Sequence, residues 1–415
     1  MSNEKTITRR GLLGAAGAAG AAGLVAGGAG GAVAAQTLHD DLTALASVGA
    51  ATVPFHGDRQ AGITTPLQAH GHLIAFDLAA GTGRKGAAAL LRRWSAAAEA
   101  MTAGRVPSGD NQIALDAGPS SLTVTFGFGR TFFAKAGLDK QLPGSLAPLP
   151  DFSSDELVAA HSNGDLWVQI GSDDGLVAFH ALRIVQKEAG DAARLRWQMN
   201  GFNRTPGATA EPRTARNLMG QIDGTNNPKP SEPTFDRRIF VPESGSDGSP
   251  EWMAGGSYAV VRRIRMLLDS WDNLSLERQE KVIGRRKSDG APLSAGSGGT
   301  ETTPVDLDKR DADNLLAIAS DAHVRVAKPE SNGGAALLRR PWSYHDGFRD
   351  DGAPDAGLLF VCWQSDPLTG FVPVQRKLDS GDGLSRYLRH ESSALFAVPG
   401  GAAKGEYVGQ RLLEA

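Results

Sequence analysis

The chain has 415 residues, of which 41% are hydrophobic, and its 43 Lys and Arg against 46 Asp and Glu give a net charge of -3. This length supports a full hydrophobic core in two or three domains, or in one large domain with two lobes. The near balance of charge provides no basic face for phosphate groups, which argues against a nucleic-acid partner. Cys362 is the only cysteine, so a disulfide framework and a metal cluster held by several cysteines are excluded.

The first 34 residues differ in composition from the rest and predict a signal peptide. A polar start containing Arg9 and Arg10 precedes a run rich in Gly and Ala, and Ala32 and Ala34 have the small side chains of a cleavage site. The segment Thr8–Leu13 resembles the twin-arginine motif, which implies recognition by the twin-arginine export machinery and an extracytoplasmic location. The alternative is a disordered leader with a chance arginine pair. After cleavage, no stable transmembrane segment is expected, because the body has no run of about 20 strongly apolar residues.

The first half of the body predicts the order β-α-β-β-α-β. Short apolar or alternating runs typical of strands occur at 71–79, 120–129, 164–172 and 194–202. Apolar residues at intervals of three and four predict helices at 84–101 and 172–190.

The second half repeats this order in five further segments, at 255–268, 275–286, 355–366, 370–380 and 392–400. We therefore predict an α+β fold of two ferredoxin-like halves, each an antiparallel sheet with peripheral helices, packed as in a dimeric alpha-beta barrel. The predicted limits are 1–34 for the signal peptide, 35–215 for the first half and 216–415 for the second. A polar connection at 205–233 and an insertion at 288–304 are the longest loops, and long loops in compact folds are often functional.

Nine histidines are present, and most histidines in proteins are surface or satisfied core residues. A single histidine can nevertheless hold a metal when a macrocycle provides the in-plane ligands, as in haem. His323, in the segment Ser320–Arg325, is the best candidate for such a ligand. The alternative for His323 is a loop residue hydrogen-bonded by Asp321.

A second candidate is Asp223, in the segment Gly220–Pro228. Glycines on both sides let the backbone turn sharply and approach a flat ligand while the carboxylate points inward. A carboxylate above a haem could take a proton from peroxide and return it to the leaving oxygen. The alternative is an ordinary turn built on an aspartate.

A third candidate is the pair Arg339-Arg340, which follows Leu337-Leu338. A guanidinium keeps its charge and presents several donors, so it suits the negative charge that develops when an oxygen–oxygen bond breaks. The alternative is a surface pair that stacks on Trp342 or pairs with carboxylates.

Taken together, GQIDGT, DAHVRVA and LLRR resemble the motifs of the dye-decolorizing peroxidases. The resemblance extends over HGDRQAGITTPLQAHGHLIAFDL, GGSYAVVRRIRM and GLLFVCWQSDPLTGFVPVQRKL, and it covers the chain from about residue 55 to the C-terminus. These segments look like the exported bacterial branch, type A, which includes proteins also called deferrochelatases. The resemblance implies one haem b per chain, held by the second half, and the double ferredoxin-like fold.

The resemblance also implies roles for individual residues. His323 would be the axial ligand of the haem iron, Asp223 the distal acid–base residue and Arg339, which directly follows the apolar pair, the distal arginine. The implied haem contacts are Gly224, Thr225, Asn226, Lys328, Pro329, Glu330 and Arg339. Lys328-Pro329-Glu330 departs from the family's commoner Asn-Pro-Arg, so contacts there are expected from the backbone. Asp382 resembles the carboxylate that binds the other nitrogen of the ligand imidazole.

The implied function is a peroxidase that reduces hydrogen peroxide through a ferryl intermediate and oxidises dyes, phenols or other one-electron donors. Large dyes cannot enter a tight pocket, so Tyr387 is a candidate electron relay, with Trp342, Tyr344 and Trp363 also in the second half. An alternative is a deferrochelatase-like protein that handles haem or iron with little peroxidase turnover. A copper or other single-metal module is disfavoured, because no cluster of His, Cys and Met is present.

Overall fold

The computed structural model describes residues 48–209, 213–242 and 248–415. The predicted signal peptide, 1–34, lies outside the described residues. No helix in the described part of the chain is long and apolar enough to span a membrane.

The first half has the predicted order of elements. They are β1 (His70–Leu78), α3 (Gly83–Thr102), β2 (Thr123–Gly129), α4 (Arg130–Ala136), β3 (Leu166–Ser172), α5 (Gly175–Ala189) and β4 (Ala193–Phe202). Helix α5 begins where it does because the Asp174 carboxylate accepts hydrogen bonds from the backbone N–H groups of Leu176 and Val177. It ends at Gly190, whose φ of 51° is one that glycine adopts readily.

The second half repeats the order, with two strands that the sequence patterns did not indicate. Its elements are α6 (Phe235–Ile239), β5 (Ser257–Met266), α7 (Leu268–Asp272), α8 (Leu276–Ile283), α9 (His323–Ala327), β6 (Leu338–Arg339), β7 (Trp342–Phe348), β8 (Pro354–Gln364), α10 (Phe371–Gly381), β9 (Leu388–Val398) and α11 (Gln410–Leu413). Strand β7 supplies the second of the four strands that a ferredoxin-like half requires.

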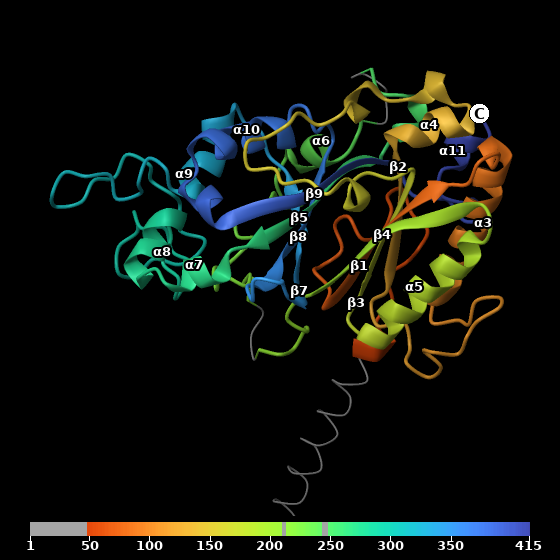
Figure 1. Ribbon diagram of the computed structural model, residues 1–415, viewed down its shortest axis with the longest axis horizontal. Helices are drawn as coiled ribbons and strands as arrows, with labels where there is room; N and C mark the ends of the chain where they lie inside the picture. Colours follow the sequence, from red (N-terminus) through yellow and green to blue (C-terminus); the bar gives the residue numbers. More distant parts are fainter. Residues whose placement is uncertain (1–47, 210–212, 243–247) are drawn as a thin grey trace, which may run out of the picture.

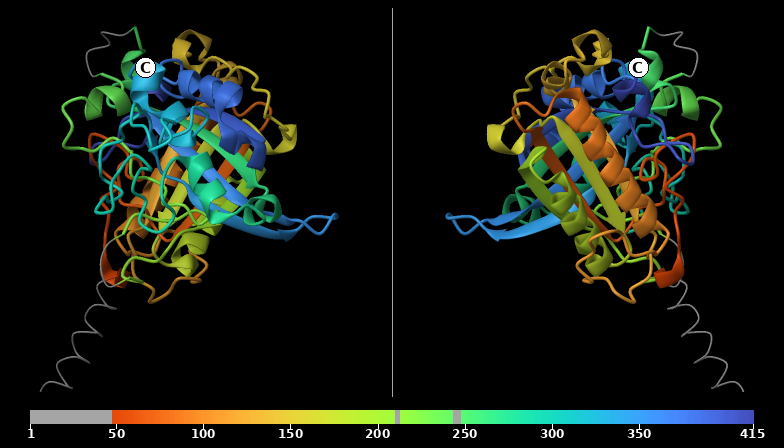
Figure 2. Two further views of the ribbon diagram at one scale, coloured as in Figure 1. Left: turned by 90° about the vertical axis from the view of Figure 1, so that its left-hand side faces the viewer. Right: turned by 90° about the vertical axis from the view of Figure 1, so that its right-hand side faces the viewer.

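The strands of both halves join edge to edge in one nine-stranded antiparallel sheet. Its order is β5-β9-β2-β3-β1-β4-β7-β8-β6, and β5 also pairs with β8. The halves meet where β2 pairs with β9 and where β4 pairs with β7. Because β5 pairs with both β8 and β9, eight strands form a closed ring, and most helices lie outside it, with α3 and α5 on one side and α7 to α10 on the other (Figures 1 and 2).

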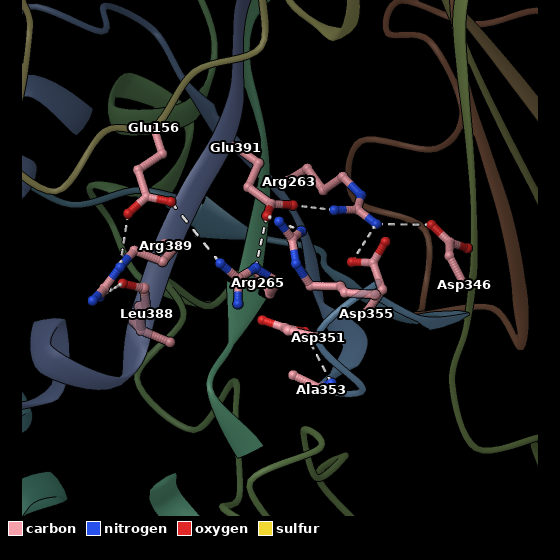
Figure 3. A network of polar contacts seen from close by, with 11 residues as sticks. Glu156, Arg263, Arg265, Asp346, Asp351, Ala353, Asp355, Leu388, Arg389 and Glu391 are labelled. Atoms are coloured by element: carbon pink, nitrogen blue, oxygen red, sulfur yellow. Dashed lines mark hydrogen bonds and ion pairs between the residues drawn. The ribbon is translucent and has the colours of Figure 1, made fainter. Parts of the chain in front are cut away.

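Alternate residues of each strand point into the ring, where aromatic side chains fill the space. Trp167 stacks on Phe396 with ring centroids 5.3 Å apart, and Trp363 lies 5.8 Å from Trp167. Along β5 the inward series continues into Arg263, which binds Asp346 and Asp355 at 2.9 Å each and also pairs with Glu391, a network that Figure 3 shows. Charged residues thus satisfy one another where the apolar interior ends.

Candidate active site

The outer face of the second half bounds a cavity. Its walls come from β5, β8 and β9 on one side and from α9 and α10 on the other. Apolar side chains make up much of the surface: Ile264, Met266, Leu358, Phe360, Phe371, Val374, Leu378 and Leu384. The cavity also brings together most of the residues predicted from sequence, namely Asp223, Gly224, Thr225, Asn226, His323, Lys328, Pro329, Arg339 and Asp382.

His323 is the first residue of α9 and is oriented by a buried carboxylate. Its Nδ1 lies 2.7 Å from Oδ2 of Asp382, whose side chain is 2% exposed and whose Oδ1 accepts the Leu384 N–H at 3.0 Å. Since an ionised carboxylate only accepts, Nδ1 carries the hydrogen, and in the neutral imidazole Nε2 is left with a lone pair. Burial works to lower the pKa of His323, but the neighbouring Asp382 carboxylate raises it, and the net shift is upward.

The local backbone explains why Asp382 is the partner of His323 and Asp321 is not. The Gly383 N–H donates to the backbone carbonyl of Asp321 at 2.8 Å, which joins the end of α10 to the residues just before α9. Asp321 therefore acts through its main chain, and the carboxylate of Asp382 reaches the imidazole. The alternative of a loop histidine bonded by the Asp321 side chain is not what the structure shows.

Asp223 and Arg339 form an ion pair in the same cavity. Nη1 of Arg339 lies 2.6 Å from Oδ1 of Asp223, although the two residues are 116 positions apart in the chain. The other carboxylate oxygen has a longer contact, 3.4 Å, with Nδ2 of Asn217. The turn after Asp223 depends on Gly224, whose φ of 124° disfavours any residue with a side chain.

Arg340 points elsewhere and has a different environment. Its guanidinium donates to the carbonyls of Gly62 and Pro66 and to Oε1 of Gln68, and the residue is 4% exposed. Burial lowers its pKa to about 10. Arg340 thus joins the segment before β1 to the connection between β6 and β7. Arg339 is the arginine that lines the cavity.

Two predicted residues do not line the cavity. The side chain of Glu330 is 69% exposed and lies 3.7 Å from Nζ of Lys328. Tyr387 packs edge-on against Trp271, with ring centroids 5.4 Å apart, and its neighbour Leu388 is the residue that reaches the cavity. Trp342, Tyr344 and Trp363 are fully buried inside the ring of strands.

The structure adds polar residues that sequence reasoning missed. Asn217 contacts the carboxylate of Asp223, and Asn227 bonds the main chain of Arg339. His390 lines the cavity from β9, and burial lowers its pKa to about 3, so it is neutral at physiological pH. Asn217 and Asn227 could have been found as polar residues beside the Asp-Gly turn, but nothing in the pattern of β9 distinguishes His390.

The donor groups in the cavity fit a haem. In the part of the chain that the structure describes, no three or more His, Cys, Asp and Glu side chains are grouped to hold a metal ion. Two imidazoles line the cavity, and among the described residues only that of His323, unlike that of His390, is oriented by a carboxylate while its Nε2 has no protein partner. A metal bound by one imidazole takes its in-plane ligands from a macrocycle, and the apolar walls suit one.

This fold, with a single oriented imidazole and a carboxylate–guanidinium pair in one apolar cavity, defines a haem-dependent peroxidase. The family models of the Dyp-type peroxidase N-terminal and C-terminal domains match residues 60–203 and 214–403. The chain therefore belongs to the Dyp-type peroxidase family. It is an oxidoreductase that uses haem, hydrogen peroxide and a reducing substrate.

Relatives of two kinds are similar over most of their length. The dye-decolorizing peroxidase of Thermobifida fusca is 47% identical over 365 residues, covering 86% of this chain and 84% of that protein. A deferrochelatase of Yersinia pestis is 36% identical over 380 residues, covering 87% and 85%. Among solved structures, ferric DtpA from Streptomyces lividans has a TM-score of 0.87 and 69% identity, covering 89% of this chain and 99% of that one.

Proposed function

We propose that His323 holds the haem iron through Nε2 and that Asp382 fixes the imidazole for this task. The hydrogen bond from Nδ1 to Asp382 sets the tautomer and makes the ligand nitrogen more electron-rich. Bound haem supplies the iron at which peroxide is reduced. Gly224, Thr225, Asn226, Lys328 and Pro329 border the same cavity and would contact the group.

Asp223 is the proton relay in this proposal, and Arg339 provides fixed positive charge. Because Oδ1 of Asp223 is occupied by the guanidinium, Oδ2, with only its long contact to Asn217 among the described residues, is the oxygen that takes the peroxide proton and returns it. The Arg339 guanidinium remains charged throughout and stabilises the negative charge that develops on the leaving oxygen.

The observation that carries this proposal is the meeting of the two pairs, His323–Asp382 and Asp223–Arg339, in one cavity. His323→Ala should abolish the normal Soret spectrum, whereas His345→Ala, at an exposed histidine of β7, should leave it unchanged. Asp223→Asn should slow the reaction with peroxide by about 10²- to 10⁴-fold in stopped-flow measurements. An unchanged spectrum in the first variant, or an unchanged rate in the last, would contradict the assigned roles.

The reducing substrates we propose are dyes, phenols and other one-electron donors, supported by the similarity to a dye-decolorizing peroxidase. Tyr387 would relay electrons from large donors, since it is partly exposed, packs on Trp271 and precedes a residue of the cavity wall. Tyr387→Phe should reduce the rate with a large anthraquinone dye and spare the rate with a small phenol. A rate with the anthraquinone dye equal to that of the parent protein would remove Tyr387 from the path.

A second candidate function is release of iron from haem, favoured by the similarity to the deferrochelatases. Incubation with haem, followed by chromatography of the pigment, distinguishes this function from peroxidase activity. Intact iron-free porphyrin would support the second function, and peroxide-dependent dye oxidation with haem retained would support the first.

We further propose export by the twin-arginine route, supported by Arg9-Arg10 and the Gly/Ala-rich run that follows. Replacing both arginines by lysine should keep the protein in the cytoplasm. Cell fractionation measures this, and unchanged export would contradict the proposal.

A further inference from the structure

Asn227 joins the two segments that carry the cavity's ion pair. Its side-chain amide makes two hydrogen bonds to the main chain of one residue, Arg339. Oδ1 accepts the Arg339 N–H at 3.1 Å, and Nδ2 donates to the Arg339 carbonyl at 2.7 Å. The two residues are 112 positions apart, so the contact depends entirely on the tertiary fold.

The register of the sheet explains why Arg339 has both main-chain groups available. Strand β6 is at the end of the strand order and pairs only with β8 among the described strands, with Arg339 opposite Cys362. The next residue, Arg340, donates its N–H to Val361 of β8. In antiparallel pairing such bonded positions alternate, so the N–H and C=O of Arg339 point away from β8. The Asn227 amide occupies the place of a neighbouring strand and imitates a peptide group.

The same turn that contains Asn227 also contains Asp223. The Asn227 N–H donates to the Gly224 carbonyl at 3.0 Å, and the Asp223 N–H donates to the Ala215 carbonyl at 2.9 Å. The turn is therefore held at Asp223 by the preceding chain at Ala215, and at Asn227 by Arg339 of β6. Since Asn227 bonds the main chain of Arg339, it fixes the backbone from which the Arg339 side chain extends toward the Asp223 carboxylate.

We propose that Asn227 is a positioning residue that holds Asp223 and Arg339 at the separation needed for the reaction with peroxide. This inference rests on the proposed roles of Asp223 and Arg339. Misplacement of catalytic groups by about 1 Å costs up to about 100-fold in rate, and loss of an outer hydrogen-bonding partner typically costs about 10- to 100-fold.

The test compares Asn227→Ala with Asn203→Ala in the haem-loaded full chain. Asn203 is a matched control because its Nδ2 donates to the Pro341 carbonyl at 3.0 Å, two residues beyond Arg339, from a segment without Asp223. Asn227→Ala should slow the peroxide reaction by about 10- to 100-fold and weaken the binding of fluoride to the ferric haem, with an unchanged Soret spectrum. Asn203→Ala should change neither. Asn227→Ser, which can keep at most one of the two bonds, should give an intermediate rate.

Two results would overturn the inference. One is a normal peroxide rate and fluoride affinity in Asn227→Ala while Asp223→Asn is slow, since the proposed function would then stand without a role for Asn227. The other is an equal slowing in Asn203→Ala, because a general loosening of β6 and β7 would account for both. If Asp223→Asn itself reacts normally with peroxide, the failure belongs to the proposed function.

Discussion

The two halves share one order of elements but use the space between sheet and helices differently. In the first half, α3 and α5 lie directly on the outer face of the sheet, and Trp94 of α3 is enclosed there, stacked on Phe126 of β2 with ring planes 9° apart. In the second half, the corresponding face of β5 and β8 borders the cavity that contains His323 and Asp223. Repetition of a fold thus produces one half that is packed for stability and one that keeps room for a cofactor.

The difference follows from the elements that cover each face. Helix α3 has 20 residues and α5 has 15, with small and apolar side chains directed at the sheet. Helix α9 has five residues and begins with His323, while α10 contributes Phe371, Val374 and Leu378 to the cavity wall. A short helix cannot cover the sheet face, so apolar wall residues remain for a flat ligand to contact.

The largest expected effect on stability is in the packed half. Trp94→Ala removes a side chain that is 1% exposed and whose Nε1 donates to the Val185 carbonyl at 2.9 Å. We expect a loss of about 3–5 kcal/mol in the free energy of unfolding, measured with urea, because a large enclosed side chain leaves a cavity. Phe179→Ala on α5, where the side chain is 44% exposed, should change stability by less than about 0.5 kcal/mol. A similar loss of stability in both variants would contradict this expectation, because enclosure between helix and sheet would then not determine the effect of removing an aromatic side chain.

Most of this architecture could be predicted from sequence because strand and helix periodicities are local. The strands of the first half and β5, β8 and β9 have such patterns. Strands β6 and β7 were missed, since β6 has two residues and Pro341 separates it from β7. Closure into a ring depends on pairings such as Phe202 with Ser343, which no local pattern encodes.

A smaller effect is expected at the cavity wall, and it should depend on haem. Leu358 is 8% exposed and lines the cavity, so in the haem-free protein its side chain already lacks neighbours on one side. Leu358→Ala should lower the free energy of unfolding by about 2 kcal/mol without haem, at the low end for a leucine-to-alanine change, and by more with haem bound. Urea unfolding of both forms measures this.

The matched control for that variant is Leu182→Ala on α5. Leu182 is 1% exposed and enclosed in the first half, so its loss should be larger than that of Leu358 without haem and should not change when haem is added. Equal losses in the haem-free protein would show that the second half is as tightly packed as the first.

The site was predictable where chemistry and resemblance coincide and was missed where only the fold brings residues together. Asp223, His323, Arg339 and Asp382 line one cavity. Glu330 is turned outward, since the chain after α9 forms a tight turn ending at Gly333, where φ is 62°. The contact of Asn227 with Arg339 depends on an edge strand too short to have a sequence signature, and so it could not be anticipated.

The smallest expected effect depends on pH and lies in the packed half, where the loop after α3 is attached to α5. Asp110 in this loop pairs with His180 of α5, with side chains 7% and 8% exposed. Burial acts to raise the pKa of Asp110, but the hydrogen bond with His180 and backbone N–H groups lower it, and the net shift is downward. Ionised Asp110 therefore stabilises the fold above its unfolded pKa, near 4, and this contribution disappears as pH falls through the lower folded value.

Asp110→Asn should accordingly cost about 1.5 kcal/mol at pH 7, and the difference from the parent protein should shrink below about pH 4. Urea unfolding at pH 7, 5 and 3.5 measures the difference, with Asp139→Asn, at an exposed position after α4, as the control. Since the pair lies in the half without the cavity, the Soret spectrum of the folded variant should equal that of the parent protein at each of these pH values. A deficit that stays constant down to pH 3.5 would mean that the neutral amide has lost shape complementarity, and that ionisation of Asp110 contributes nothing to holding the loop on α5.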